Sequence, residues 1–151
     1  MIATLGIDPG VNGGVAVLRP DGSIRLLEPF RPSMTHGELV EVVRDAVHAL
    51  HEDLSRSVFV EKVGTMPHDG RKGANTFGRV DGLIRGALIM AHYPPVDVLP
   101  MQWQAALNCL TGGNKNVTKR RAHEIWPSVK WTHAIADAAL IARYGWERLR
   151  L

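Results

Sequence analysis

Acidic residues follow two apolar segments in the first half of the chain. Asp8 comes after the apolar run 2–7, and Glu61 comes after the run 58–60. Short apolar, β-branched runs of this kind are typical of buried strands. If the two strands are neighbours, both carboxylates leave the same edge of the sheet, and their charges repel unless a cation lies between them. Taken singly, Asp8 also fits a simple turn and Glu61 an exposed strand end.

A third acidic residue lies inside a strongly apolar segment near the end of the chain. Asp137 is flanked by alanine, leucine and isoleucine residues throughout 134–142, and His133 precedes it by four residues. Four residues make about one helical turn, so the two side chains share one helix face. A carboxylate in a buried helix costs several kcal/mol unless it is paired or binds a metal. Asp137 is therefore a candidate ligand, whereas His133 alone also fits a hydrogen-bonded core histidine.

These residues together predict one kind of chemistry. Asp8, Glu61 and Asp137 offer carboxylate oxygens, which favour Mg²⁺ or Mn²⁺ over zinc. Two such ions, roughly 3.5–4 Å apart, can activate a water and stabilise the leaving oxygen when a phosphodiester is hydrolysed. His133 is either a fourth ligand or a group that assists proton transfer.

The hydrophobic pattern predicts the elements that must position these residues. Three strands at 2–7, 14–18 and 24–27 form an antiparallel meander, because Pro20-Asp21-Gly22 supplies a turn. Thr35 and Glu38 form a capping box before a helix, which crosses over to a parallel strand at 58–60. Beyond it we expect a basic loop at 64–74, a helix at about 76–92 and a strand at 96–99. Three further helices are expected: one that starts at Pro100, one at 117–126, and one at 133–144 that Gly145 stops. The order resembles the ribonuclease H-like α/β fold, a mixed five-stranded sheet flanked by helices.

Length and composition exclude several classes of protein. The 151 residues, of which 45% are hydrophobic and 22% charged, fit one domain over 1–151. With Cys109 as the only cysteine, no internal disulfide can form. We expect a cytoplasmic protein without a membrane segment. Residues 1–70 carry six Lys/Arg and ten Asp/Glu, whereas residues 71–151 carry twelve and five, so the second half could face a polyanion.

Several motifs resemble the RuvC-type Holliday-junction resolvases. They span nearly the whole chain in the expected order: 6–10 (GIDPG), 13–16 (GGVA), 60–63 (VEKV), 66–67 (MP), 76–79 (TFGR) and 133–138 (HAIADA). The segments 100–103 (PMQW) and 115–127 resemble the phage and organelle branch of that family. Two positions depart from the pattern. His133 stands near a position where many relatives carry an aspartate, and 64–66 (GTM) replaces the aromatic wedge of the standard bacterial enzymes.

The resemblance implies a ribonuclease H-like homodimer that nicks Holliday junctions and other branched DNA symmetrically, with two Mg²⁺ ions per site or Mn²⁺ in their place. Asp8, Glu61 and Asp137 are then the acidic catalytic residues and metal ligands, with His133 as a possible substitute for the missing aspartate. A phage enzyme of this kind would act in the host cytoplasm.

Basic and glycine residues suggest where DNA and a second subunit would bind. The candidate phosphate contacts are Lys62, Arg71, Lys72, Thr76, Arg79, Lys115 and Lys119, with Thr76 near a helix N-terminus that could bind phosphate. Gly78, Gly82 and Gly86 recur in the predicted helix at 76–92, although each costs about 1 kcal/mol relative to alanine. We expect them to permit close approach across a dimer axis, with Val80, Leu83, Ile84, Ala87 and Met90 forming the core face.

Three other functions compete with this interpretation, and the last of them is disfavoured by chain length. A less selective nuclease of the same fold could act on forks, flaps or RNA. A junction-binding protein without catalysis is favoured if the change at His133 disables metal binding. An actin-like ATPase or sugar kinase would explain the opening Asp8-Pro9-Gly10 but needs two domains, for which this chain is too short.

Overall fold

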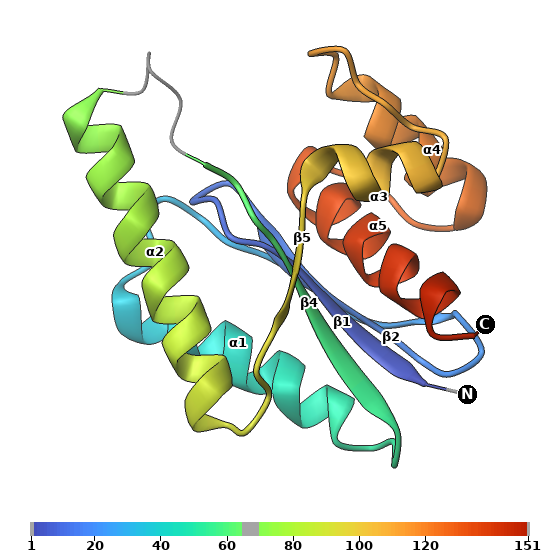
Figure 1. The fold of residues 1–151 in the computed structure, drawn as a ribbon, viewed down its shortest axis with the longest axis horizontal. Helices are drawn as coiled ribbons and strands as arrows, with labels where there is room; N and C mark the ends of the chain where they lie inside the picture. Colours follow the sequence, from blue (N-terminus) through green and yellow to red (C-terminus); the bar gives the residue numbers. More distant parts are fainter. Residues whose placement is uncertain (1, 65–69, 151) are drawn as a thin grey trace.

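The computed structural model describes residues 2–64 and 70–150, and five strands of this part form one mixed sheet. Along the sheet the order is β3-β2-β1-β4-β5 (Figure 1). The first three strands pair antiparallel, whereas β4 pairs parallel to β1 and β5 parallel to β4. The predicted meander and parallel crossover are confirmed. The bounds are β1 Ala3–Asp8, β2 Gly14–Leu18, β3 Ile24–Pro29, β4 Arg56–Glu61 and β5 Val96–Val98.

Helices cover both faces of the sheet, so the described residues form three layers (Figure 1). On one face lie α1 (His36–Leu50) and α2 (Arg71–Met90). On the other lie α3 (Pro100–Ala106), α4 (Asn116–Ile125) and α5 (His133–Arg148). A hydrophobic core fills the space on each side of the sheet. Within residues 2–64 and 70–150, none of the helices combines the length and apolar character needed to cross a bilayer.

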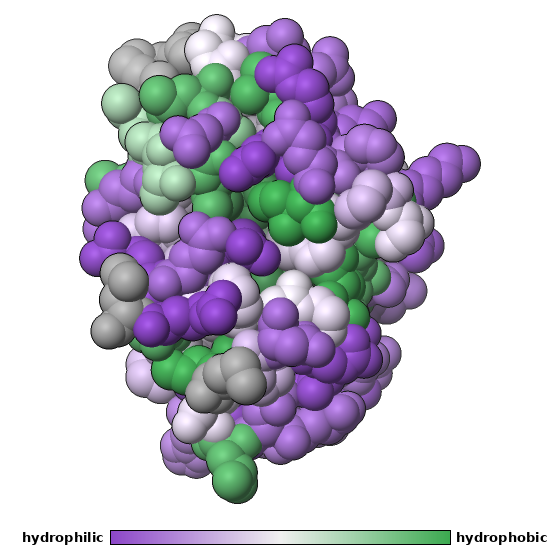
Figure 2. Space-filling view, turned by 90° about the vertical axis from the view of Figure 1, so that its right-hand side faces the viewer, coloured by the Kyte–Doolittle hydropathy of each residue, from purple (hydrophilic) through white to green (hydrophobic). Residues whose placement is uncertain are grey.

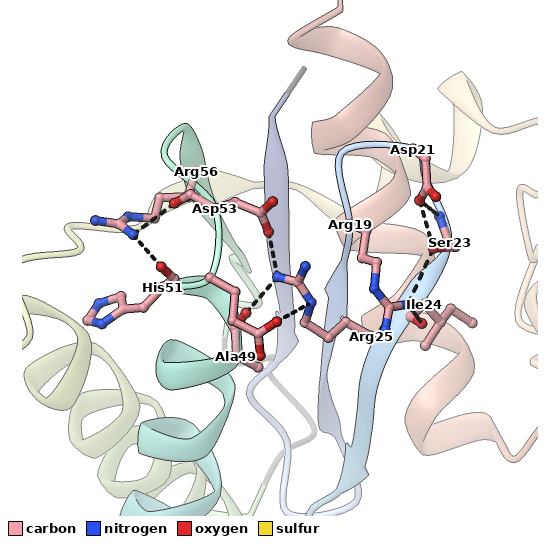
Figure 3. Close-up of polar contacts among 10 residues, drawn as sticks. Arg19, Asp21, Ser23, Ile24, Arg25, Ala49, His51, Asp53 and Arg56 are labelled. Carbon is pink, nitrogen blue, oxygen red and sulfur yellow. Dashed lines mark hydrogen bonds and ion pairs between the residues drawn. The ribbon is translucent and has the colours of Figure 1, made fainter.

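Polar contacts fix both ends of α1. At its start the Thr35 hydroxyl accepts from the Glu38 amide at 3.2 Å and the Glu38 carboxylate accepts from the Thr35 amide at 2.7 Å, which confirms the capping box. At its end the Arg25 guanidinium of β3 donates to the Ala49 carbonyl at 2.8 Å and to the Asp53 carboxylate (Figure 3). A cation at a helix C-terminus is favourable, so Arg25 holds α1 against the sheet.

The apolar helix α5 lies unusually close to β1. A β-carbon at Gly6 would lie 2.3 Å from the backbone nitrogen of Ala142, so only glycine fits between strand and helix. The buried Thr4 hydroxyl donates to the Ala142 carbonyl at 3.0 Å. Small residues on both elements therefore allow the close packing that brings the acidic residue of α5 towards the end of β1.

Three sequence-based expectations are corrected here. The helix α2 starts at Arg71 rather than near Thr76, so part of the expected loop is helical and Thr76 lies inside the helix, where its amide is not free for phosphate. Gly145 does not stop α5, which continues to Arg148; its hydrogen side chain instead makes room for the Phe59 ring. Met90 is 80% exposed rather than part of the core. Residues 65–69, with the predicted Met66-Pro67 motif, lie outside the described residues.

Candidate active site

Asp8 and Glu61 lie at the carboxyl ends of adjacent parallel strands. Ile7 of β1 pairs with Val60 of β4, so the two acidic residues take the next positions of the same register. In open α/β sheets the carboxyl ends of the strands are where ligands bind. The strand pairing thus brings together two carboxylates that are 53 residues apart in the sequence.

The turn after β1 closes tightly around Asp8. The Gly10 amide donates to Asp8 Oδ1 at 3.2 Å. A β-carbon at Gly13 would lie 2.1 Å from the Asp8 carbonyl oxygen, so a glycine is required where the turn passes over Asp8. The glycines of the first motif therefore serve to position this carboxylate.

Asp137 joins the two strand-end carboxylates from α5. It lies one turn into the helix, next to Ala138, whose carbonyl approaches Gly6 of β1. Its Oδ1 atom is buried and has no hydrogen-bond partner among the described residues. A buried carboxylate oxygen without a partner is costly, so this atom is a candidate for binding a cation.

The three carboxylates share one electrostatic environment. Burial, with a smaller effect of the nearby charge of Asp137, raises the pKa of Asp8 to about 6 against the opposing effect of the Gly10 amide. Burial, followed by the charge of Asp8, raises the pKa of Glu61 to about 7. Burial also raises the pKa of Asp137, against the opposing effects of the Thr118 hydroxyl, Lys115 and His133. Removing water from like charges that lie near one another disfavours their ionised forms, and a bound cation would relieve this cost.

The donor set suits a hard divalent cation, because carboxylate oxygens are the ligands that Mg²⁺ and Mn²⁺ prefer. Within the described residues, however, no three acidic, histidine or cysteine side chains already form a group that could hold a metal. Asp8, Glu61 and Asp137 are thus neighbours whose chemistry fits a metal, rather than a ready-made ligand group. His133, the exposed first residue of α5, lies one turn before Asp137 and lowers its pKa.

Two buried polar residues at this site were not predicted from the sequence. The indole N–H of Trp103 in α3 donates to Glu61 Oε1 at 2.8 Å. Thr118 of α4 is 1% exposed, donates to the Lys115 carbonyl at 3.1 Å and lowers the pKa of Asp137. The apolar spacing marks Trp103 as a core residue, but its partner is 42 positions away in the sequence. No local pattern could have identified that contact.

The predicted DNA-contacting residues fall into three places. Lys115 precedes α4 and is close enough to lower the pKa values of all three carboxylates. Lys62 follows Glu61 and makes an exposed ion pair with Asp97 at 3.8 Å. The remaining side chains are exposed on the first half of α2 (Arg71, Lys72, Thr76 and Arg79) or on α4 (Lys119).

Comparisons with known proteins identify the fold. No family model and no curated protein matches the sequence. Among solved structures, Thermus thermophilus RuvC in complex with a Holliday junction substrate is 22% identical, with 99% of this chain and 96% of RuvC covered and a TM-score of 0.71. The Thermus thermophilus RuvC structure in a second determination gives the same identity and score over 98% of this chain. The yeast mitochondrial Holliday junction resolvase Ydc2 is 16% identical, with 96% of this chain and 77% of Ydc2 covered and a TM-score of 0.53. The chain therefore has the ribonuclease H-like fold of RuvC.

Proposed function

We propose that residues 1–151 form one nuclease domain, a structure-selective endonuclease that resolves Holliday junctions and other branched DNA by symmetric nicking. The observation that carries this proposal is the convergence of Asp8 on β1, Glu61 on β4 and Asp137 on α5 at one end of the sheet, where burial raises the pKa of each carboxylate. Such clustering of perturbed carboxylates is typical of catalytic sites. The fold shared with RuvC, which was solved with a Holliday junction substrate, favours branched DNA as the substrate.

The residues have distinct parts in this proposal. Asp8, Glu61 and Asp137 hold the divalent ions, Mg²⁺ or Mn²⁺ and two per site, with His133 as a further ligand or proton-transfer group. When bound, such ions supply an activated water and stabilise the leaving oxygen of a phosphodiester. Lys115, which acts electrostatically on all three carboxylates, orients the phosphate at their side. Gly10 and Gly13 keep Asp8 in place through the tight turn described above.

A basic groove on α4 supports a path for the DNA backbone. Asn116, Lys119, Arg120 and His123 follow a helical spacing along one face of α4, and with Val129, Lys130 and Trp131 they line a single groove. The groove begins at Asn116, directly after Lys115 at the carboxylates. Hydrophilic residues predominate on the side of the molecule that carries α4 and α5 (Figure 2). Phosphates leaving the active site would therefore meet successive positive charges.

A second row of candidate contacts lies on α2. Lys72, Thr76 and Arg79 are spaced at four and three residues, so they share one helix face, with Arg71 beside them. The first half of α2 and the helix α4 flank the end of the sheet where β1 and β4 finish (Figure 1). DNA held between these two helices would present a backbone phosphate to the carboxylates. Lys62 would join the contact if its exposed pair with Asp97 opens.

We further propose that the protein is a homodimer through the face formed by α1 and α2. A β-carbon at Gly78, Gly82 or Gly86 would meet nothing within 4 Å among the described residues, so packing against the sheet does not explain these glycines. Gly82 and Gly86 line an apolar groove between α1 and α2 together with Val43, Val47, Leu83, Ala87 and the exposed Met90. A second copy would bury this groove, and its two-fold axis would match a junction of two-fold symmetry.

The decisive experiment compares the wild-type protein with Asp8→Asn on synthetic four-way, three-way and linear DNA of equal length, with Mg²⁺, Mn²⁺ or chelator. We expect metal-dependent nicks at symmetric positions of the four-way junction. In Asp8→Asn, cleavage should fall at least about 10³-fold while junction binding stays within a few-fold, because the substitution removes a negative charge without changing the side-chain size.

Two results would contradict this proposal, and a third would show that Asp8→Asn is not a valid test of it. Equal cutting of linear and branched DNA would favour a less selective nuclease. Tight junction binding without any cleavage would favour a non-catalytic binding protein, which the absence of a ready-made metal group among the described residues makes the second candidate. Loss of binding together with cleavage in Asp8→Asn would indicate structural damage at the β1 turn.

A further inference from the structure

The indole N–H of Trp103 points at the proposed active site. Its side chain is wholly buried in the core between the sheet and α3–α5, where it packs in one cluster with Val98, Leu107 and Ala136. The helix that carries it is held at its start by Pro100 and by the Gln102 side chain, which accepts from the Leu99 amide at 2.9 Å. Packing and capping together fix the position of the indole ring.

The neighbouring strands bring this ring to Glu61. In the parallel pair of β4 and β5, Glu61 is opposite Val98, and the Lys62 amide donates to the Val98 carbonyl at 2.8 Å. Therefore α3, which starts two residues after β5, begins beside the end of β4. From one turn into α3, the Trp103 N–H donates to Glu61 Oε1 at 2.8 Å in a buried contact.

This hydrogen bond satisfies a buried donor and a buried acceptor. A buried indole N–H requires an acceptor, and a carboxylate that is only 8% exposed requires donors. The bond also distinguishes Glu61 from the other two carboxylates. Asp8 Oδ1 is held by the backbone amide of Gly10, whereas Asp137 Oδ1 has no partner among the described residues. The carboxylate of Glu61, at the end of β4, thus accepts a buried hydrogen bond from an indole on α3.

We propose that Trp103 is the positioning residue for Glu61. By engaging Oε1, the indole fixes the carboxylate plane and leaves Oε2 as the oxygen that binds a divalent cation beside Asp8 and Asp137. This inference rests on the proposed metal-dependent function. Hydrogen bonds from residues behind a metal ligand orient that ligand, and their loss typically lowers metal affinity about 10- to 100-fold.

The test is Trp103→Phe, which retains an aromatic ring in the core but removes the N–H. Binding of Mn²⁺ is measured by electron paramagnetic resonance in the absence of DNA, and the Mg²⁺ dependence of junction nicking is measured in parallel. We expect Mn²⁺ affinity to fall about 10-fold or more. The Mg²⁺ concentration for half-maximal nicking should rise to a similar extent, whereas nicking at saturating Mg²⁺ should largely recover.

Trp146→Phe is the matched control. Trp146, near the end of α5, is 5% exposed and donates through its Nε1 atom to the Pro20 carbonyl at 3.0 Å rather than to a carboxylate of the site. It therefore loses the same kind of hydrogen bond and should keep the Mn²⁺ affinity of the wild-type protein. Urea unfolding and circular dichroism of both variants verify that the core remains folded.

The possible outcomes separate this inference from the proposed function. Mn²⁺ affinity of Trp103→Phe within twofold of the Trp146→Phe value, in a protein that still nicks junctions, overturns the role of Trp103 alone. Equal losses of affinity in the two variants would indicate a general weakening of the core and overturn it as well. If the wild-type protein neither binds Mn²⁺ nor nicks DNA, the proposed function fails and the inference fails with it.

Discussion

The proposed chemistry depends on three acidic side chains that lie where charge is costly. Glu61 is buried, and the pKa values of Asp8 and Glu61 are raised to about 6 and about 7 because water is excluded and like charges are near. Carboxylates with strongly perturbed pKa values cluster at functional sites, so they are informative about function. At this scale, the burial of these carboxylates and the unpartnered Asp137 Oδ1 atom support the proposed binding of a cation.

The raised pKa values predict how stability depends on pH in metal-free protein. The folded chain holds the protons of Asp8 and Glu61 more tightly than the unfolded chain, whose carboxyls have ordinary pKa values of 3.8 and 4.5. The stability that these two groups allow is therefore fully present below about pH 4 and is lost as the pH rises through about 6 and 7. The free energy of unfolding should fall by on the order of 5 kcal/mol on the account of both groups together.

Glu61→Gln isolates this effect in urea unfolding with chelator present. Near pH 4, where Glu61 is protonated, wild type and variant should have similar stability. At pH 8 the variant should be more stable by about 1–3 kcal/mol, because it has no charge to bury. Added Mg²⁺ should narrow the difference by stabilising the wild-type protein alone. A difference that is the same at both pH values would mean that Glu61 is not strained in the folded state.

The elements matter because their packing decides how closely the carboxylates meet. The strand pairing of β1 with β4 aligns Asp8 and Glu61, and the glycine and alanine contact of β1 with α5 adds Asp137. Phe59 of β4 packs over Gly145 further along the same helix. The contacts of α5 with β1 and β4 at these two points thus depend on glycine, and a single added methyl group should disturb them.

Gly6→Ala tests the docking of α5. The new β-carbon would lie 2.3 Å from the Ala142 nitrogen and 2.4 Å from the Ala138 carbonyl oxygen, so the helix must shift. We expect a loss of about 2–3 kcal/mol in urea unfolding, together with reduced nicking because Asp137 moves away. Gly73→Ala is the control, since its β-carbon would meet nothing within 4 Å among the described residues, and it should change stability by less than about 1 kcal/mol. Equal effects of the two substitutions would contradict the close contact of β1 and α5.

At the scale of the whole molecule, the proposed active site and the proposed dimer interface lie on different faces. The carboxylates and basic helix faces gather at one end of the sheet, whereas the apolar groove with Gly82 and Gly86 lies between α1 and α2. Each copy has one candidate site, and symmetric nicking of a junction needs two. The groove would join two copies without covering the groove on α4.

Gly82→Leu should therefore weaken dimerisation. The leucine side chain would fill the groove where the second copy is expected, and sedimentation should show a shift towards monomer at micromolar concentration. The monomer itself should fold normally, because open space surrounds this position among the described residues. Paired nicks on one junction should be replaced by single nicks. An unchanged sedimentation profile would argue against this face as the interface.

The sequence by itself determined the order of the elements, the mixed sheet and the candidate carboxylates, because hydrophobic periodicity, capping residues and turn residues act over a few neighbouring positions. It misplaced the start of α2, the end of α5 and the exposure of Met90, where nearby glycines give ambiguous local signals. Only the tertiary structure decided that Trp103 holds Glu61, that Gly6 admits α5 to the sheet and that Gly82 faces open space. These features depend on distances between residues far apart in the chain, and such distances are set by how the layers pack.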